Sequence, residues 1–145
     1  MNDGRDADVS DEHDAIVLHP AGWTTPRGYT DGMSASGRYV VLAGQIGWNP
    51  LTAAIETDDF AAQVRQALAN IATLLAEAGA APRHLVRLTW FVTDRGAYVA
   101  ARRDVGRAYR EVIGMHYPPM SVVVVAGLVE ERALVEIEAT AIVPH

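Results

Sequence analysis

The sequence predicts one two-layer α+β domain, in which two helices lie against one face of a mixed β-sheet. Two long segments repeat apolar residues at three- and four-residue steps, the spacing of amphipathic helices. Short runs rich in β-branched and aromatic residues precede, separate and follow them, which gives the order β-β-α-β-α-β-β. A chain of 145 residues, half of them hydrophobic, is long enough to form one core.

The chain is expected to begin with a disordered acidic tail over residues 1–14, which lack apolar periodicity, followed by a single domain over 15–145. Residues 19–32 are rich in glycine, proline and threonine and are expected to form an irregular loop. Trp23 and Tyr29 in this loop either cover the core or form the wall of a pocket.

The first two strands are predicted to form a hairpin of residues 33–36 and 38–46, because Ser36-Gly37 between them is typical of a turn. Gly44 and Gly47 flank the end of the second strand. Glycines in such a place indicate close backbone approach to a ligand, a neighbouring strand or another chain.

The first helix is predicted over 59–78, with Thr57 or Asp58 as its cap and Gly79 at its end. Its polar face is expected to comprise Gln63, Arg65, Gln66 and Glu77. A strand over 85–93 follows. One face of that strand is predicted to comprise Val86, Leu88, Trp90 and Val92.

The second helix is predicted over 97–113, with Asp94 as its cap and Gly114 at its end. Its buried stripe is expected to comprise Tyr98, Ala101, Val105, Ala108, Tyr109 and Val112. Its four arginines are expected to face solvent for the most part; they are Arg102, Arg103, Arg107 and Arg110.

Residues 117–143 are predicted to form two strands joined by a short turn, and the second strand carries Glu136 and Glu138. Two carboxylates two residues apart on a strand point to one face, while the intervening apolar side chains point to the other. These glutamates either perform acid–base chemistry, or lie on a wet edge or pair with arginines. The two helices leave the opposite face of the sheet uncovered and largely apolar, which predicts an oligomer.

Composition excludes several classes of protein. The chain has no cysteine and no lysine, so thiol chemistry, disulfides and lysine Schiff bases are excluded, and a cytoplasmic location is expected. The net charge is −6; six carboxylates and one arginine in residues 1–14 account for −5 of it, leaving −1 for the rest, so no nucleic-acid partner is expected. No membrane span, histidine pair with metal-ligand spacing or phosphate-binding loop is found in the sequence, so no membrane, metal or cofactor is expected.

The motifs AGQIGWNP, QVRQALANIATLLAEAGA, LVRLTWFVTD, YPPM and LVEIEATAIV, in this order, resemble the Rid proteins (reactive intermediate deaminases, or YjgF family) over residues 28–143. The resemblance implies a chorismate-mutase-like α+β fold, assembled as a homotrimer with pockets between subunits. It also implies hydrolysis of reactive enamines and imines to carbonyl compounds and ammonia without a cofactor.

The resemblance also implies roles for single residues. Glu136 is similar to the glutamate that activates the hydrolytic water, Tyr29 to the pocket tyrosine and Gly44 to the glycine whose backbone approaches the ligand. Ala43 stands where the family motif has a serine, and Gly106 where a helix carries an asparagine.

Met120 stands where active members of the family have the arginine that binds the substrate carboxylate. Because a thioether cannot form a charge-assisted bidentate pair, the sequence predicts a larger or more apolar substrate, with Trp90, Tyr117 or Trp48 as pocket walls. Arg27 or Arg87 is a candidate replacement for the missing cation. The alternative to an imine hydrolase is a non-catalytic trimer that binds a small metabolite or has a regulatory role.

Overall fold

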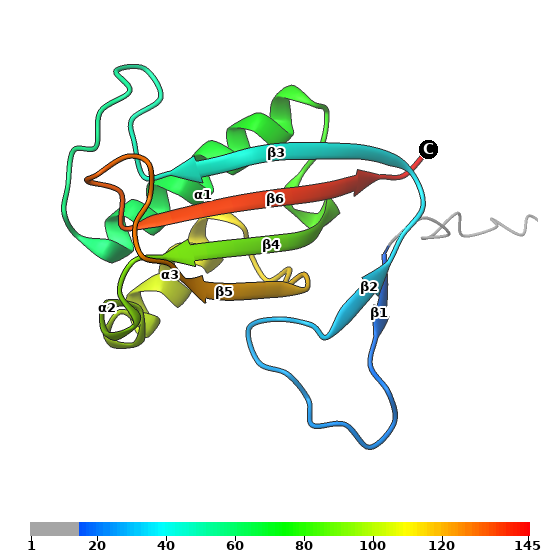
Figure 1. Ribbon diagram of the computed structural model, residues 1–145. Helices are drawn as coiled ribbons and strands as arrows, with labels where there is room; N and C mark the ends of the chain where they lie inside the picture. Colours follow the sequence, from blue (N-terminus) through cyan, green and yellow to red (C-terminus); the bar gives the residue numbers. More distant parts are fainter. Residues whose placement is uncertain (1–14) are drawn as a thin grey trace, which may run out of the picture.

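A computed structural model describes residues 15–145, so the predicted tail over residues 1–14 lies outside the described part of the chain. A four-stranded sheet with the order β3-β6-β4-β5 forms the centre of the domain, and the helices lie behind it (Figure 1). The strands of this sheet are β3 (Arg38–Ile46), β4 (Leu85–Val92), β5 (Met120–Val124) and β6 (Val135–Val143). The helices are α1 (Phe60–Glu77), η1 (Pro82–His84), α2 (Arg95–Ala100) and α3 (Arg102–Val112). The predicted α+β class with helices on one face of a mixed sheet is confirmed.

The predicted hairpin of residues 33–36 with 38–46 is wrong. Strand β2 (Gly32–Ser34) pairs instead with an additional short strand, β1 (Ile16–Leu18), and this pair projects away from the body with the loop that joins its strands (Figure 1). Gly37 does not form a tight turn: its φ is +149°, and a Cβ there would overlap the backbone of Val143 on β6. The glycine is therefore explained by close approach to β6.

The last two strands are not a hairpin either. β5 is parallel to β4, and β6 lies antiparallel between β3 and β4, so β4 separates β5 from β6. The predicted alternation along β6 is confirmed: Val135 and Ile137 are fully buried, Glu136 is half-buried and Glu138 is exposed.

The helices begin and end close to the predicted positions. The cap of α1 is Asp59, the residue that follows the predicted candidates Thr57 and Asp58, since its Oδ2 accepts a hydrogen bond from the Ala62 N–H at 2.9 Å. Asp94 caps α2 as predicted, accepting from the Ala97 N–H at 2.7 Å. The predicted second helix is two segments, α2 and α3, which meet at Ala101.

Two buried positions differ from the predicted pattern. Gln63 was expected on the polar face of the first helix, but it is fully buried. Its Nε2 donates to the carbonyls of Thr57 (2.9 Å) and Arg132 (3.1 Å), and its Oε1 accepts from the Leu134 N–H at 2.8 Å. On β4 an irregularity in register puts Leu85, not Val86, into the core.

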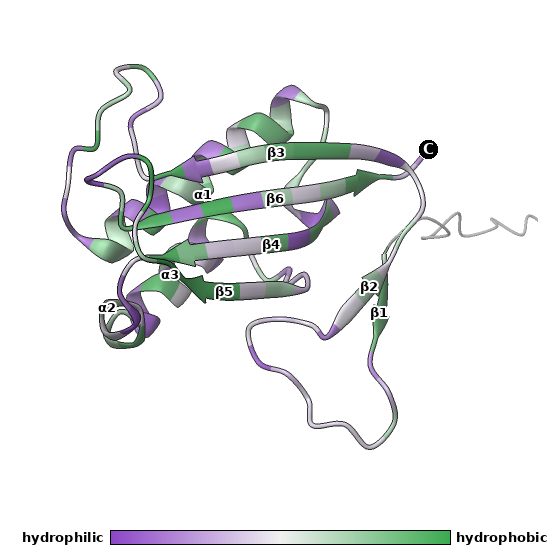
Figure 2. Ribbon diagram, viewed as in Figure 1, coloured by the Kyte–Doolittle hydropathy of each residue, from purple (hydrophilic) through white to green (hydrophobic). Residues whose placement is uncertain are grey.

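The face of the sheet opposite the helices is open in Figure 1. Hydrophobic residues lie along both edge strands of this sheet in Figure 2. On the open face, Tyr39, Val41 and Val123 are 69%, 72% and 42% exposed. Exposed apolar area of this kind is typical of a surface that another protein chain covers.

Candidate functional site

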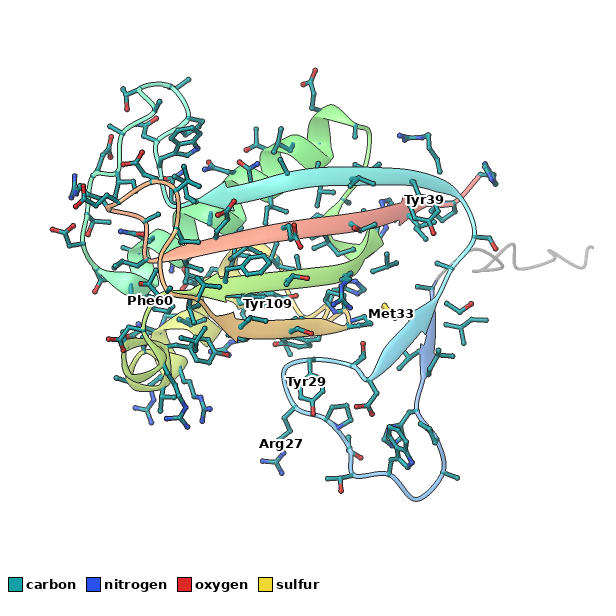
Figure 3. The ribbon with its side chains drawn as sticks, viewed as in Figure 1. Arg27, Tyr29, Met33, Tyr39, Phe60 and Tyr109 are labelled. Carbon is teal, nitrogen blue, oxygen red and sulfur yellow. The ribbon has the colours of Figure 1, made fainter. Side chains whose placement is uncertain are left out.

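A cavity of about 580 Å³ lies on the helix side of the sheet, at the β5 edge. The loop that joins β1 to β2 reaches it, because Thr30 forms a parallel bridge with Pro119, next to the start of β5. Figure 3 shows Tyr29 and Arg27 on the arm of this loop that passes the start of β5. The cavity is lined by Arg27, Gly28, Tyr29, Trp90, Tyr98, Arg102, Val105, Gly106, Tyr109, Arg110, Tyr117, Met120 and Val122.

Five of the thirteen residues that line the cavity are aromatic. Tyr109 and Tyr117 stack with ring centroids 5.3 Å apart and an interplanar angle of 13°. The Tyr109 hydroxyl donates to the carbonyl of His116 at 2.6 Å. Burial, and next the neighbouring Tyr117, raise the pKa of Tyr109 well above its usual range, so its phenol stays neutral.

One polar group in the wall has no partner. Trp90 is 3% exposed, and its indole N–H makes no hydrogen bond within the described part of the chain. Buried donors in folded proteins almost always have an acceptor. The indole N–H of Trp90 is therefore a candidate donor to a bound ligand.

Three arginines bring positive charge to the cavity. Arg102 lies over the ring of Tyr98 at 5.9 Å, and Arg110 lies beside Gly106. The third arginine that lines the cavity is Arg27, and none of the lining residues is acidic. Arg27, Arg102 and Arg110 form no ion pair with any residue of the described range 15–145. The cavity is therefore cationic and suited to an anion.

Glu136 belongs to a second group of residues. It is half-buried on β6 and makes no hydrogen bond or ion pair with another described residue. The pairing of β3 with β6 is irregular between Leu42 and Gln45, at a bulge that contains Ala43 and Gly44. Gly44 lies directly against the Glu136 side chain, where a Cβ would overlap the carboxylate. The bulge and its glycine thus leave room for this carboxylate.

The cavity and Glu136 lie on opposite faces of the sheet. Directly opposite residues of neighbouring strands point to the same face. Trp90 is paired with Ile137, which is buried under the helices, whereas Phe91 is paired with Glu136. Within one chain the carboxylate therefore does not face the cavity.

The predicted site residues thus separate into two groups. Tyr29, Trp90, Gly106, Tyr117 and Met120 all line the cavity. The other group contains Ala43, Gly44 and Glu136.

Other predicted positions lie elsewhere. Trp48 and Trp23 do not line the cavity, and Trp23 is 61% exposed, so it does not cover the core. Of the two candidate replacement arginines, Arg27 lines the cavity, whereas Arg87 lies with Glu138 beside a smaller hollow of about 250 Å³.

Arg102 and Arg110 are exposed, as expected for arginines on a solvated face, but they also line the cavity, which the sequence does not predict. The available signal is that both are four residues from Gly106, because such spacing places side chains on one face of a helix. Among residues 15–145 no three side chains of the metal-binding types are grouped for a metal ion, and no helix there is long and apolar enough to cross a membrane.

The fold and site define a small two-layer α+β protein with a cationic, aromatic cavity and a separate half-buried carboxylate. Residues 24–143 match the family described as Endoribonuclease L-PSP. A RutC family protein of Haemophilus influenzae is 35% identical over 106 residues, 73% of this chain and 80% of that protein. The 2-iminobutanoate/2-iminopropanoate deaminase of Salmonella typhimurium is 33% identical over 109 residues, 73% of this chain and 80% of that enzyme.

Solved structures of Rid and YjgF proteins are also similar to this chain. A Rid family protein of unknown function from Yersinia pestis, YyfB, superimposes with a TM-score of 0.78 at 31% identity, covering 90% of this chain and 99% of that one. The E. coli YjgF gene product gives a TM-score of 0.62 at 32% identity, covering 79% and 87%. The chain belongs to the Rid (YjgF) family, whose members include imine deaminases.

Proposed function

We propose that the protein hydrolyses a reactive enamine or imine to a carbonyl compound and ammonia. The observation that carries this proposal is Glu136, a half-buried carboxylate without a partner in the described chain, held against Gly44. The relatives of this chain include an enzyme named as an imine deaminase. Together these support Glu136 as the group that moves protons during hydrolysis.

In the proposed reaction, Glu136 accepts a proton from a water molecule as the water oxygen adds to the imine carbon. Glu136 then donates that proton to the nitrogen, which gives an intermediate with a hydroxyl and an amino group on the same carbon. Glu136 next takes the hydroxyl proton and passes it to the nitrogen as the carbonyl forms and the carbon–nitrogen bond breaks, so ammonia leaves and the carboxylate is restored. An enamine enters the same sequence after protonation at carbon gives the imine.

The proposed enzyme is a homo-oligomer, the trimer that the family resemblance implies, in which Glu136 of one copy faces the cavity of the next. The separation of the two groups by the sheet supports this, because one chain alone cannot present both to one substrate. The exposed side chains of Tyr39, Val41 and Val123 would become buried in such an assembly.

The proposed substrate differs from the small imino acids named for the Salmonella relative. Met120 lines the cavity at the position of the expected arginine, and its thioether cannot pair with a carboxylate. A cavity of about 580 Å³ with aromatic walls favours a larger, less polar substrate.

The test is to generate 2-aminoacrylate and bulkier imines in situ and follow the carbonyl product. We expect wild type to accelerate hydrolysis of at least one bulky imine, and Glu136→Gln to lose that acceleration. Glu138→Gln is the matched control, since Glu138 is an exposed glutamate on the same face of the same strand. Equal rates for wild type and Glu136→Gln with every imine contradict the proposal.

A second candidate is a non-catalytic protein that binds a small metabolite. It is favoured by the cavity itself, which has aromatic walls, arginines and an unpartnered indole without any contribution from Glu136. RNA cleavage is not proposed, because outside residues 1–14 the net charge is −1 and a phosphate backbone needs a basic surface.

A further inference from the structure

The Arg110 guanidinium lies beside the cavity, close to the residue one turn earlier on α3. A Cβ at position 106 would lie 3.2 Å from Nη1 of Arg110, so a side chain there would move the guanidinium by a few tenths of an ångström. Glycine is unfavourable in the interior of a helix. A locally unfavourable residue that makes room for a cation at a cavity is typical of a functional position.

The rest of the lining favours a planar ligand. Of the tyrosines that stack together, Tyr109 uses its hydroxyl on the His116 carbonyl, and the hydroxyl of Tyr117 contacts Sδ of Met115 at 3.7 Å. These two residues therefore present rings rather than hydroxyl groups. Met120 adds an apolar contact, and the free indole N–H of Trp90 adds one buried donor.

We propose that the cavity binds an aromatic carboxylate, an aryl-substituted 2-imino acid or its 2-keto acid product. Its carboxylate binds the Arg110 guanidinium, its oxygen or nitrogen accepts from the indole N–H of Trp90, and its ring packs against Tyr117. Arg110, together with Arg102 and Arg27, thus supplies the anion binding that position 120 lacks. This inference rests on the proposed function for the reaction, but the binding can be tested without turnover.

The experiment measures binding by calorimetry with the full-length protein and three probes. Benzoylformate has both an aryl ring and a carboxylate, 1-phenylpropane-1,2-dione keeps the ring without the charge, and 2-oxobutanoate keeps the charge without the ring. Benzoylformate is expected to bind at least roughly 10-fold more tightly than either of the others.

The decisive variants are Arg110→Met and Arg103→Met. Arg103 is exposed on the same helix, has no described ion pair and does not line the cavity, so it is the matched control. Arg110→Met is expected to weaken benzoylformate binding roughly 10- to 100-fold, and Arg103→Met to leave it unchanged. Arg110→Lys, which keeps the charge without the planar guanidinium, is expected to fall between them and covers the case that Arg110→Met does not fold.

Equal affinity for benzoylformate and 2-oxobutanoate overturns the inference, and so does equal weakening by Arg110→Met and Arg103→Met. The failure of the proposed function looks different. In that case benzoylformate still binds through Arg110, but wild type hydrolyses no imine. Glu136→Gln separates the two further, because it is expected to abolish turnover, whereas benzoylformate still binds and Arg110→Met still weakens that binding in the Glu136→Gln background.

Discussion

Gly44 on β3 and Glu136 on β6 lie in contact, and any side chain at position 44 would occupy the place of the Glu136 carboxylate. The contact occurs at the bulge between Leu42 and Gln45, where one extra residue of β3 interrupts the regular pairing. The room that the carboxylate occupies is therefore provided by a neighbouring strand as well as by its own.

Gly44→Ala is expected to displace Glu136 and to lower the rate of imine hydrolysis by roughly 10- to 100-fold, because misplacement of a catalytic group by about 1 Å has an effect of this size. Gly127→Ala is the control, since a Cβ at Gly127 meets no atom within 4 Å. Steady-state rates that are equal for the two variants would show that the contact does not matter.

Two inactive variants are expected to restore each other if a site is shared between copies. Glu136→Gln removes the carboxylate, and Gly106→Phe fills the cavity beside Arg110. In a trimer assembled from equal amounts of both, about a quarter of the sites combine an intact Glu136 with an intact cavity. Co-expression should therefore recover about a quarter of the wild-type rate. If one chain forms the whole site, no activity returns.

The raised pKa of Tyr109 is expected to lower the free energy of unfolding at alkaline pH. Its pKa in the folded protein is raised by burial and next by Tyr117, whereas an unfolded tyrosine has a pKa of about 10. Its contribution to stability is complete below pH 10. Above that the unfolded chain releases the proton and the folded chain keeps it, so the free energy of unfolding falls by at most on the order of 1 kcal/mol per pH unit.

Urea unfolding at a series of pH values from 8 to 11 measures this slope. Tyr109→Phe is expected to flatten it, and Tyr39→Phe, at a tyrosine that is 69% exposed, to leave it unchanged. The same slope in wild type and Tyr109→Phe would assign the alkaline loss to other groups.

Gln63→Leu is expected to reduce the free energy of unfolding by roughly 2 to 4 kcal/mol, because it leaves the buried Leu134 N–H without its acceptor and two carbonyls without their donor. Gln66→Leu on the same helix loses one hydrogen bond, to Asn70, and should cost about 1 kcal/mol or less. Chemical denaturation distinguishes the two. A smaller loss of stability for Gln63→Leu than for Gln66→Leu would contradict the inference that the Gln63 amide holds the segment before β6 in place.

The helices could be predicted because their signals are local. Apolar spacing and a capping aspartate are read within one segment, and α1 and α2 begin within about two residues of the predicted positions. Strand pairing depends on distant segments. Gly37 has the character of a turn residue in the sequence, but it is explained by the backbone of Val143, more than one hundred positions later.

The site could be predicted only in part for a similar reason. Resemblance to a family identified Glu136, Gly44 and Met120, but it carried no information about the arginines on α3. An arginine on an amphipathic helix is expected to face solvent. In the sequence, only the four-residue spacing between Gly106 and Arg110 links Arg110 to the cavity. Gln63 shows the same limit, since a polar residue in a helix is expected to face water unless its buried partners are known.

The position of the sheet between the cavity and Glu136 also has an evolutionary consequence. Replacements in the cavity alter one layer of the molecule and leave the strand contact at Gly44 untouched. Substitutions in the cavity can therefore change which ligand is bound while the glutamate keeps its position. Proteins with this architecture can evolve new ligand specificities without changing the residue that transfers protons.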